Sequence, residues 1–380
     1  MQATRRPSSL RPSRGVTLIE ILVGIAIGLI GMLVIFQTIT VWDARTRVST
    51  SSGDAQIAGS LAMFNLERDL RLAGMGFGTA GAAELGCVVN AYDNSASAGG
   101  GNFNMRPVNI VDGDPAGVPD TIEVFYGNSP FYAAAEEFTN ATASTLAATV
   151  KYGFKRGDVA IMTDKASNCR LLQITDDATA DAHMLTFGTG TYSNFYDNNA
   201  VEAVRWNSAA ASMPAISAGN LYNLGPSPRD NLWSVNTTSA TLGYASNMSS
   251  VNPGQFLGVA EGVVDMKAQY GYDANSDKQI TDAEWTKTPP ADWTKVRAIR
   301  VALLVRGRDF EHPPTSASDV TTVTYRLAAP PTWFGQNFVM KNLDGTPDSD
   351  VPASPNNWRY YRYRVYEKVI PLRNMIWGQS

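Results

Sequence analysis

The sequence predicts an α+β fold in which one long N-terminal helix is followed by a domain built mainly of strands. An apolar run covers residues 16–36, and apolar residues return with helical periodicity over residues 57–75. No proline occurs between Pro12 and Pro107, so proline does not force a break in this helix. Beyond Gly78, short apolar or alternating segments are separated by Gly, Pro, Asn and Asp, which is the pattern of strands and turns.

The apolar run of residues 16–36 carries a single charge, Glu20. Its length fits a bilayer span, which needs about 20 apolar residues, whereas a cleaved secretory signal has an apolar core of only about 7–15 residues. A carboxylate inside such a span costs about 2.5–3.5 kcal/mol on insertion scales. A plain membrane anchor is therefore one interpretation of the run, but it leaves Glu20 without a function.

The segment GVTLIE, from Gly15 to Glu20, follows a short basic leader and resembles the signal of type IV prepilins. The resemblance implies that a membrane peptidase cuts between Gly15 and Val16 and that the new amine of Val16 is methylated. It also implies that Glu20 neutralises the N-terminal amine of a neighbouring subunit, since a buried carboxylate is tolerated when it is paired. Val16 departs from the family, in which Phe or Met is usual.

The distribution of charge predicts the side of the membrane on which most of the chain lies. The net charge is −4, and the leader contributes four arginines and no acid, so removal of the leader changes −4 to −8. A basic segment before the span and an acidic chain after it predict that residues 37–380 lie outside the cytoplasm. A net acidic exported domain also argues against bulk nucleic-acid binding.

The distribution of apolar, charged and turn-forming residues divides the chain into a leader (1–15), a transmembrane helix (16–36), a helical continuation (37–75) and a β-rich globular domain (76–380).

The helical continuation carries two apolar stripes on roughly opposite sides: Ile57, Leu61, Phe64 and Met75 form one, and Ala62, Leu66, Leu70 and Ala73 form the other. A surface helix normally has one stripe. Two stripes predict burial against both its own domain and neighbouring subunits, although a fully buried core helix gives the same pattern. The glycine cluster at residues 74–78 predicts the helix end.

Strands are predicted at residues 121–126, 158–162, 171–175, 201–206, 296–306, 323–327 and 359–369. Within 296–306, one predicted face holds Ile299, Val301, Leu303 and Val305, and the other holds Arg300, Ala302, Leu304 and Arg306. Residues 207–255 are polar, poor in charge and hold four prolines, so they are expected to be mostly loop.

The two cysteines, Cys87 and Cys169, are expected to form a disulfide, because the domain is predicted to lie in an oxidising compartment. The bond would close a loop of roughly 80 residues, which is worth about 4 kcal/mol on the loop-entropy model. Two buried free thiols are the alternative.

An acidic segment, DANSDKQITDAE, matches the calcium loop of EF-hand proteins at five of its positions. The oxygen ligands would come from the side chains of Asp273, Asn275, Asp277 and Glu284 and from the backbone carbonyl of Gln279. Lys278 stands where glycine supports the sharp turn. The preceding residues alternate like a strand, so this would be a calcium site on a sheet hairpin, and an Asx-rich turn without an ion is the alternative.

The segment WRYYRYRVY at residues 358–366 interleaves arginine with aromatic residues, a combination that can bind single-stranded nucleic acid. The alternation also fits an ordinary two-faced strand, which is the preferred interpretation.

The chain has only two histidines, His183 and His312, and it has neither a GxSxG motif nor a phosphate-binding loop. No enzyme signature is found.

Three later features resemble the PilW-type minor pilins: the helix end ERDLRLAG at 67–74, the segment GDV at 157–159 before Cys169, and the run from YGYD at 270–273 to PLRN at 371–374. The resemblance implies a long N-terminal helix packed on a mostly antiparallel sheet. It also implies partnership with other minor and major pilins, the prepilin peptidase, the inner-membrane assembly platform and a tip adhesin, in a complex that primes pilus assembly and supports adhesion and twitching motility. A GspJ-like pseudopilin of type II secretion is the alternative within this class. A membrane-anchored exported enzyme or a ligand-binding adhesin is the alternative outside it.

Mass spectrometry of the protein from cells with and without prepilin peptidase tests the class. We expect a mature chain that starts at methylated Val16 only where the peptidase is present. A functional protein that keeps residues 1–15 would contradict the prepilin interpretation.

Overall fold

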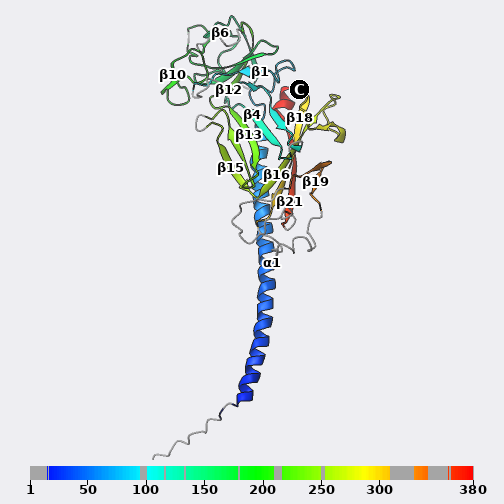
Figure 1. Ribbon diagram of the computed structural model, residues 1–380. Coiled ribbons are helices and arrows are strands. Elements are labelled where there is room, and N and C mark those ends of the chain that lie inside the picture. The colour runs from blue at the N-terminus through cyan, green and yellow to red at the C-terminus, as the bar shows by residue number, and fades with distance from the viewer. Residues whose placement is uncertain are drawn as a thin grey trace, which may run out of the picture. The chain divides into compact units, whose positions relative to one another are not determined.

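The structure is a computed structural model, and it describes residues 15, 17–94, 101–114, 117–131, 134–178, 180–208, 216–249, 253–308, 329–340, 358 and 361–379 (Figure 1). The chain divides into two units, residues 1–51 and 52–380, and each is described by itself. The predicted strand at 323–327 lies outside the described residues.

A single helix, α1, runs from Leu18 to Leu72 through 55 residues. In the first unit, residues 18–39 are long and apolar enough to cross a membrane, and none of this segment is buried. In the second unit the helix ends just before Gly74, whose φ of +78° lies in the left-handed region that glycine tolerates. The predicted helix end is therefore confirmed.

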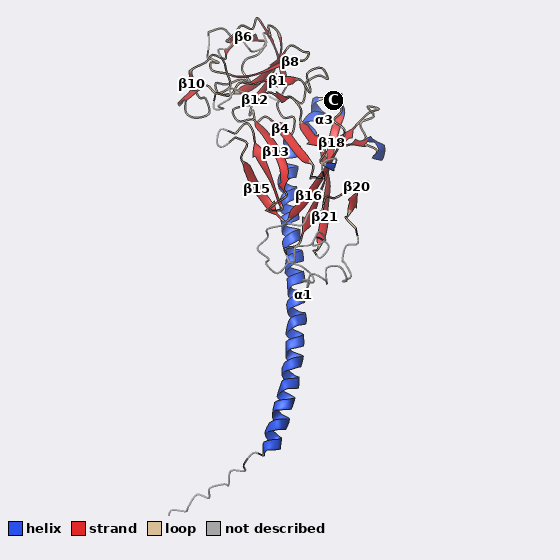
Figure 2. Cartoon of the chain, viewed as in Figure 1, coloured by secondary structure: helices blue, strands red, loops and turns tan. Residues whose placement is uncertain are grey.

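Three larger sheets follow the helix (Figure 2). The eight-stranded sheet has the order β2 (Phe103–Asn104), β1 (Val88–Asn90), β8 (Asn168–Gln173), β7 (Val159–Thr163), β12 (Gly219–Gly225), β5 (Ala135–Thr139), β6 (Thr145–Ala148) and β9 (Met184–Thr186). The five-stranded sheet has the order β15 (Phe256–Glu261), β14 (Thr241–Ser246), β13 (Arg229–Asn236), β4 (Thr121–Tyr126) and β3 (Val108–Val111). The four-stranded sheet has the order β17 (Trp285–Thr286), β16 (Val263–Tyr272), β18 (Val296–Arg306) and β21 (Tyr363–Pro371).

Shorter elements complete the described chain. Two-stranded ribbons join β10 (Thr191–Ser193) to β11 (Val201–Ala203) and β19 (Thr332–Trp333) to β20 (Gln336–Asn337). Short helices lie at Asp282–Glu284, at Trp293–Lys295 and, as α3, at Arg373–Gly378. Every described strand pair is antiparallel except β1 with β8. The α+β prediction with a mostly antiparallel sheet domain is confirmed.

The main hydrophobic core joins the C-terminal part of α1 to the sheets. Leu66 and Leu70 of α1 are fully buried in one cluster with Trp233 of β13 and Leu303 of β18. The alternation predicted for β18 is confirmed, because Ile299, Val301, Leu303 and Val305 lie in this cluster, whereas Ala302 and Leu304 pack with Trp333 and Phe338 in another. The four-stranded sheet therefore has one face toward α1 and a second face that is covered only in part.

A further core lies within the eight-stranded sheet and its loops. Along β7, Val159 and Ile161 belong to the main core, while Ala160 and Met162 belong to a separate cluster with Phe138 and its neighbours. This sheet is apolar on both faces, and it separates the main core from the cluster around Phe138.

The expectation of loop over residues 207–255 is wrong, because this stretch contributes β12, β13 and β14. Several of its polar residues are buried, and their presence at buried positions hides the alternation on which strand prediction depends. Asn223, for example, is fully buried and donates to Gly153 O at 2.7 Å and to Asp158 Oδ2 at 3.0 Å. Two predicted strands are also misplaced at their ends, since β8 begins at Asn168 and β11 stops at Ala203.

A buried carboxylate fixes α1 to the five-stranded sheet. Asp69 accepts hydrogen bonds from Asn231 Nδ2 at 2.8 Å, Trp233 Nε1 at 3.0 Å and the Tyr126 hydroxyl at 3.3 Å. Burial, together with the adjacent Asp69, raises the pKa of Tyr126 above its ordinary value, so the hydroxyl stays a donor.

Replacement of Asp69 by alanine tests this attachment. Asp69→Ala removes the carboxylate to which three buried groups donate, so we expect the free energy of unfolding of the full chain in detergent to fall by at least about 3 kcal/mol. Asp54→Ala, at an exposed position on the same helix, is the matched control and should change it by no more than about 0.5 kcal/mol. Equal denaturant midpoints for the two variants would contradict the role given to Asp69.

Candidate functional site

The N-terminal segment is described from Gly15 and from Thr17 onward, while Val16 lies outside the described residues. Glu20 stands in the first turn of α1, where its backbone N–H donates to Thr17 O at 3.0 Å and its side chain is exposed. A negative charge is favourable there, because the first turn of a helix has unpaired N–H groups and a partial positive charge. Glu20 forms no ion pair with another described residue. Its carboxylate therefore has no cationic partner among the described residues.

The two predicted stripes differ in exposure. The place predicted for Met75 in the outer stripe is wrong, because this residue lies beyond the end of α1, is half-buried and packs against the main core. Ala62, Leu66, Leu70 and Ala73 are fully buried, whereas Ile57, Leu61 and Phe64 are exposed by 70%, 46% and 63%. The interpretation as a fully buried core helix is therefore wrong. One stripe packs in the chain's own core, and the other remains an exposed apolar row on a helix.

Strand β21 holds the helix from the side of the four-stranded sheet. Lys368 Nζ donates to Glu67 Oε2 at 2.6 Å, and this hydrogen bond, against the opposing effect of burial, lowers the pKa of Glu67. The ring of Tyr366 packs directly on Gly59, where an added Cβ would lie 2.2 Å from a ring carbon. Gly59 is required by this close approach of ring to backbone.

The chain's C-terminal end closes the end of the helix. Asn374 Nδ2 donates to the carbonyl oxygens of Leu72 at 3.0 Å and Ala73 at 3.2 Å, and these are carbonyls that a helix end leaves unpaired. Gln379 Nε2 donates to Gly78 O at 2.9 Å and Ala80 O at 2.7 Å. The segment PLRN at residues 371–374 therefore caps α1 through Asn374.

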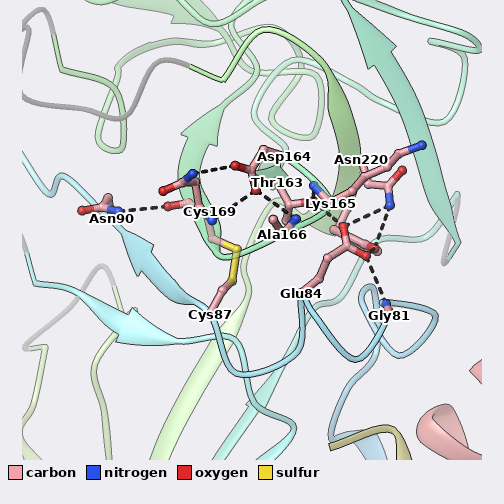
Figure 3. The surroundings of a disulfide bond; sticks show 12 residues. Gly81, Glu84, Cys87, Asn90, Thr163, Asp164, Lys165, Ala166, Cys169 and Asn220 are labelled. Atoms are coloured by element: carbon pink, nitrogen blue, oxygen red, sulfur yellow. Dashed lines mark hydrogen bonds between the residues drawn. A yellow bond between two sulfur atoms is a disulfide. The ribbon is translucent and has the colours of Figure 1, made fainter. Parts of the chain in front are cut away.

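The predicted disulfide between Cys87 and Cys169 is present, with the two Cα atoms 6.2 Å apart (Figure 3). It joins the residue before β1 to strand β8, so the alternative of free thiols is wrong. Near it, the buried Glu84 accepts from the Tyr222 hydroxyl at 2.8 Å and from Asn220 Nδ2 at 3.0 Å. These contacts and the disulfide fasten the segment after α1 to the eight-stranded sheet.

The predicted calcium loop connects β16 to β17, so it lies on a sheet hairpin as expected. Asp273 is buried, and its carboxylate accepts from the backbone N–H groups of Asp277 at 3.0 Å and Lys278 at 3.1 Å and from Arg297 Nε at 3.4 Å. Lys278 has a φ of +66°, the left-handed conformation that the glycine of calcium loops supplies. The loop geometry alone is that of an Asx-rich turn.

The other proposed ligands also have protein partners. Asn275 Oδ1 accepts from Asp277 N at 3.0 Å, and Asp277 Oδ1 accepts from Gln279 N at 2.8 Å. Glu284 accepts from Thr281 N at 2.8 Å and from Ala274 N at 3.2 Å. An ion would have to replace several of these donors to reach the carboxylates.

A second acidic cluster, missed in the sequence, lies at Asp112, Asp114 and Asp120. Two lysines lie against it: the fully buried Lys267 contacts Asp114 and lies 3.5 Å from Asp120 Oδ1, and Lys287 Nζ lies 3.2 Å from Asp112 Oδ1. Burial raises the pKa of Asp120. The lysines supply the positive charge at this cluster. The only signal in the sequence was the aspartate spacing in DGDPAGVPD, which does not reveal the distant lysines.

The arginine–tyrosine segment forms part of β21, an ordinary strand paired with β18 from Tyr363 to Pro371. Arg364 Nη1 donates to Gln56 Oε1 of α1 at 3.2 Å, so this side chain contacts the protein itself. The strand interpretation is confirmed for residues 363–366, whereas Trp358, Tyr361 and Arg362 lie before the strand.

Comparison with known families gives two matches. Residues 232–374 match the family described as type IV pilus-assembly protein W (PilW), and residues 10–36 match the prokaryotic N-terminal methylation motif. No curated protein matches the chain. A type IV-like pilin from Thermus thermophilus is similar in structure, with 10% identity over 83% of this chain and 94% of that chain and a TM-score of 0.30. A score this low supports no inference.

Proposed function

We propose that this chain, a PilW-like minor pilin of the type IV pilus by its two family matches, primes pilus assembly as part of a tip complex. The observation that carries the proposal is the asymmetry of α1 between Ile57 and Leu70. One apolar stripe is buried in the chain's own core, and the other is exposed. An exposed apolar row of this kind marks a contact surface for another protein, and other minor and major pilins present the complementary helices.

In this function Gly15 and Val16 serve in cleavage and methylation, and Glu20 then serves in assembly. The apolar helix anchors the chain in the inner membrane, with the globular domain in the periplasm, until prepilin peptidase cuts after Gly15. The assembly platform then lifts the helix from lipid into the bundle of the fibre. There Glu20 pairs with the amine of a neighbour's N-terminal residue, so the cost of its charge in an apolar environment is offset.

The role is structural, and it would support adhesion and twitching motility outside the cell through partner subunits and a tip adhesin.

A pseudopilin of type II secretion would use the same helix and the same signal, and no feature of the described structure favours it over the pilus. Deletion of the gene separates the two: loss of surface pili with protein secretion intact supports the pilus.

Calcium binding at residues 273–284 is proposed as a stabiliser of the exported domain. The site would use the side chains of Asp273, Asn275, Asp277 and Glu284 and the carbonyl of Gln279, and the left-handed Lys278 supports the required turn. The hydrogen bonds between these side chains and backbone N–H groups would hold the loop in the absence of the ion.

Exchange of Glu20 tests the assembly proposal. Glu20→Gln keeps the size and removes the charge, so loss of a charge-assisted hydrogen bond should lower incorporation into pili at least about tenfold. Glu20→Asp keeps the charge and should be incorporated better than Glu20→Gln. Pili isolated from a complemented deletion strain provide the measurement, with leader cleavage checked in each variant. Equal incorporation of the glutamine variant and the native chain would refute the proposed pairing.

Calorimetry tests the calcium site. Titration of the full chain in detergent with Ca²⁺ should give binding heat for the native protein and none for Glu284→Ala, because the bidentate ligand is lost. Glu261→Ala, at an exposed acid on the neighbouring β15, should bind as the native protein does. Absence of heat in the native protein would leave the loop as an Asx-rich turn.

A further inference from the structure

A pocket of about 280 Å³ lies on the face of the four-stranded sheet that is turned away from α1. Its floor includes Arg300 of β18, whose chain neighbours Ile299 and Val301 belong to the core that contains α1. Side chains alternate between faces along a strand, so Arg300 points to the opposite side. Contacts made through α1 therefore leave this pocket uncovered.

Aromatic rings form much of the wall. The guanidinium carbon of Arg300 lies 3.6 Å from the ring centre of Phe334, 4.8 Å from that of Trp285 and 5.4 Å from that of Trp333. Cation–π contacts of this kind hold the guanidinium in place. Phe334 is 59% exposed and occupies the turn between β19 and β20 with a φ of +44°, an unusual conformation for a residue other than glycine. The turn thus presents an apolar ring at the pocket.

The polar groups of the pocket include both signs of charge. Asp282 and Glu367 provide two carboxylates, and Arg300 provides a guanidinium. Lys368 also lines the pocket, but its ammonium group is bonded to Glu67 of α1 on the opposite face of the sheet. Two of the charged groups are held in position by the protein: Glu367 Oε2 accepts from Trp333 Nε1 at 2.9 Å, and Arg300 Nε donates to Gln269 Oε1 at 2.6 Å. An anionic ligand would face the two carboxylates and a cationic ligand the Arg300 guanidinium, whereas a neutral ligand with many hydroxyls finds both donors and acceptors.

We propose that this pocket binds the ring of a neutral sugar. The C–H face of the ring would lie on the aromatic side chains, and its hydroxyls would donate to Asp282 and Glu367 and accept from Arg300. The volume is at the small end of ligand sites, which span roughly 300–1,000 Å³, so it suits one ring. Such binding goes beyond the proposed assembly function and is independent of it.

Saturation-transfer NMR on the full chain tests the proposal. The chain is kept in a zwitterionic detergent, because maltoside detergents carry sugar head groups, and D-glucose, D-galactose and D-mannose are added separately. We expect saturation transfer to at least one of them. Phe334→Ser and Asp282→Asn should each weaken its binding at least about fivefold, since one ring contact or charged hydrogen bond is removed. Both residues are exposed, which favours an intact fold.

Two control variants outside the pocket test whether a loss of binding is specific to the pocket. Tyr152→Ser, at an exposed aromatic residue in the eight-stranded sheet region, should bind as the native chain does, and so should Asp197→Asn. The pocket variants should still enter pili, so failure of sugar binding is distinguishable from failure of assembly. The proposal is overturned if none of the three hexoses receives saturation, or if binding is unchanged in both pocket variants.

Discussion

The buried carboxylate of Asp69 is the interaction on which the arrangement of the globular unit depends. It accepts three hydrogen bonds from β4 and β13, and an unpaired carboxylate or an unpaired donor in this place would be costly. These bonds fix the orientation of α1 about its own axis. They therefore determine which apolar stripe faces the core. The exposure of Ile57 and Phe64 on the other side is then a consequence of the same contact.

Helices and strands whose apolar residues repeat with one regular spacing could be predicted from the sequence. Strand β18 alternates without interruption and begins and ends where expected, and the glycines after Leu72 mark the end of the helix. Strands β12 to β14 could not be found this way, because residues such as Asn223 and Asn231 are polar yet buried. Their stability comes from hydrogen bonds to partners far away in the chain, and a local pattern contains no information about those partners.

The proposed site residues differ in the same way. Gly15, Val16 and Glu20 belong to one continuous motif, so sequence reasoning could propose them. Cys87 and Cys169 had no other cysteine with which to pair, so their disulfide could be predicted. The pocket around Arg300 is different. Its walls come from β17, β18, β21 and the turn between β19 and β20, and only the pairing of distant strands brings them together.

Asn374 caps the end of α1 and Gln379 bonds the turn that follows it, so residues late in the domain hold one of its first elements. During synthesis these residues emerge after every described strand of the domain. The carbonyls of Leu72 and Ala73 therefore receive their hydrogen bonds only after Asn374 has been made. A chain that stops before Asn374 would leave both carbonyls without this amide, so the end of its helix would fray.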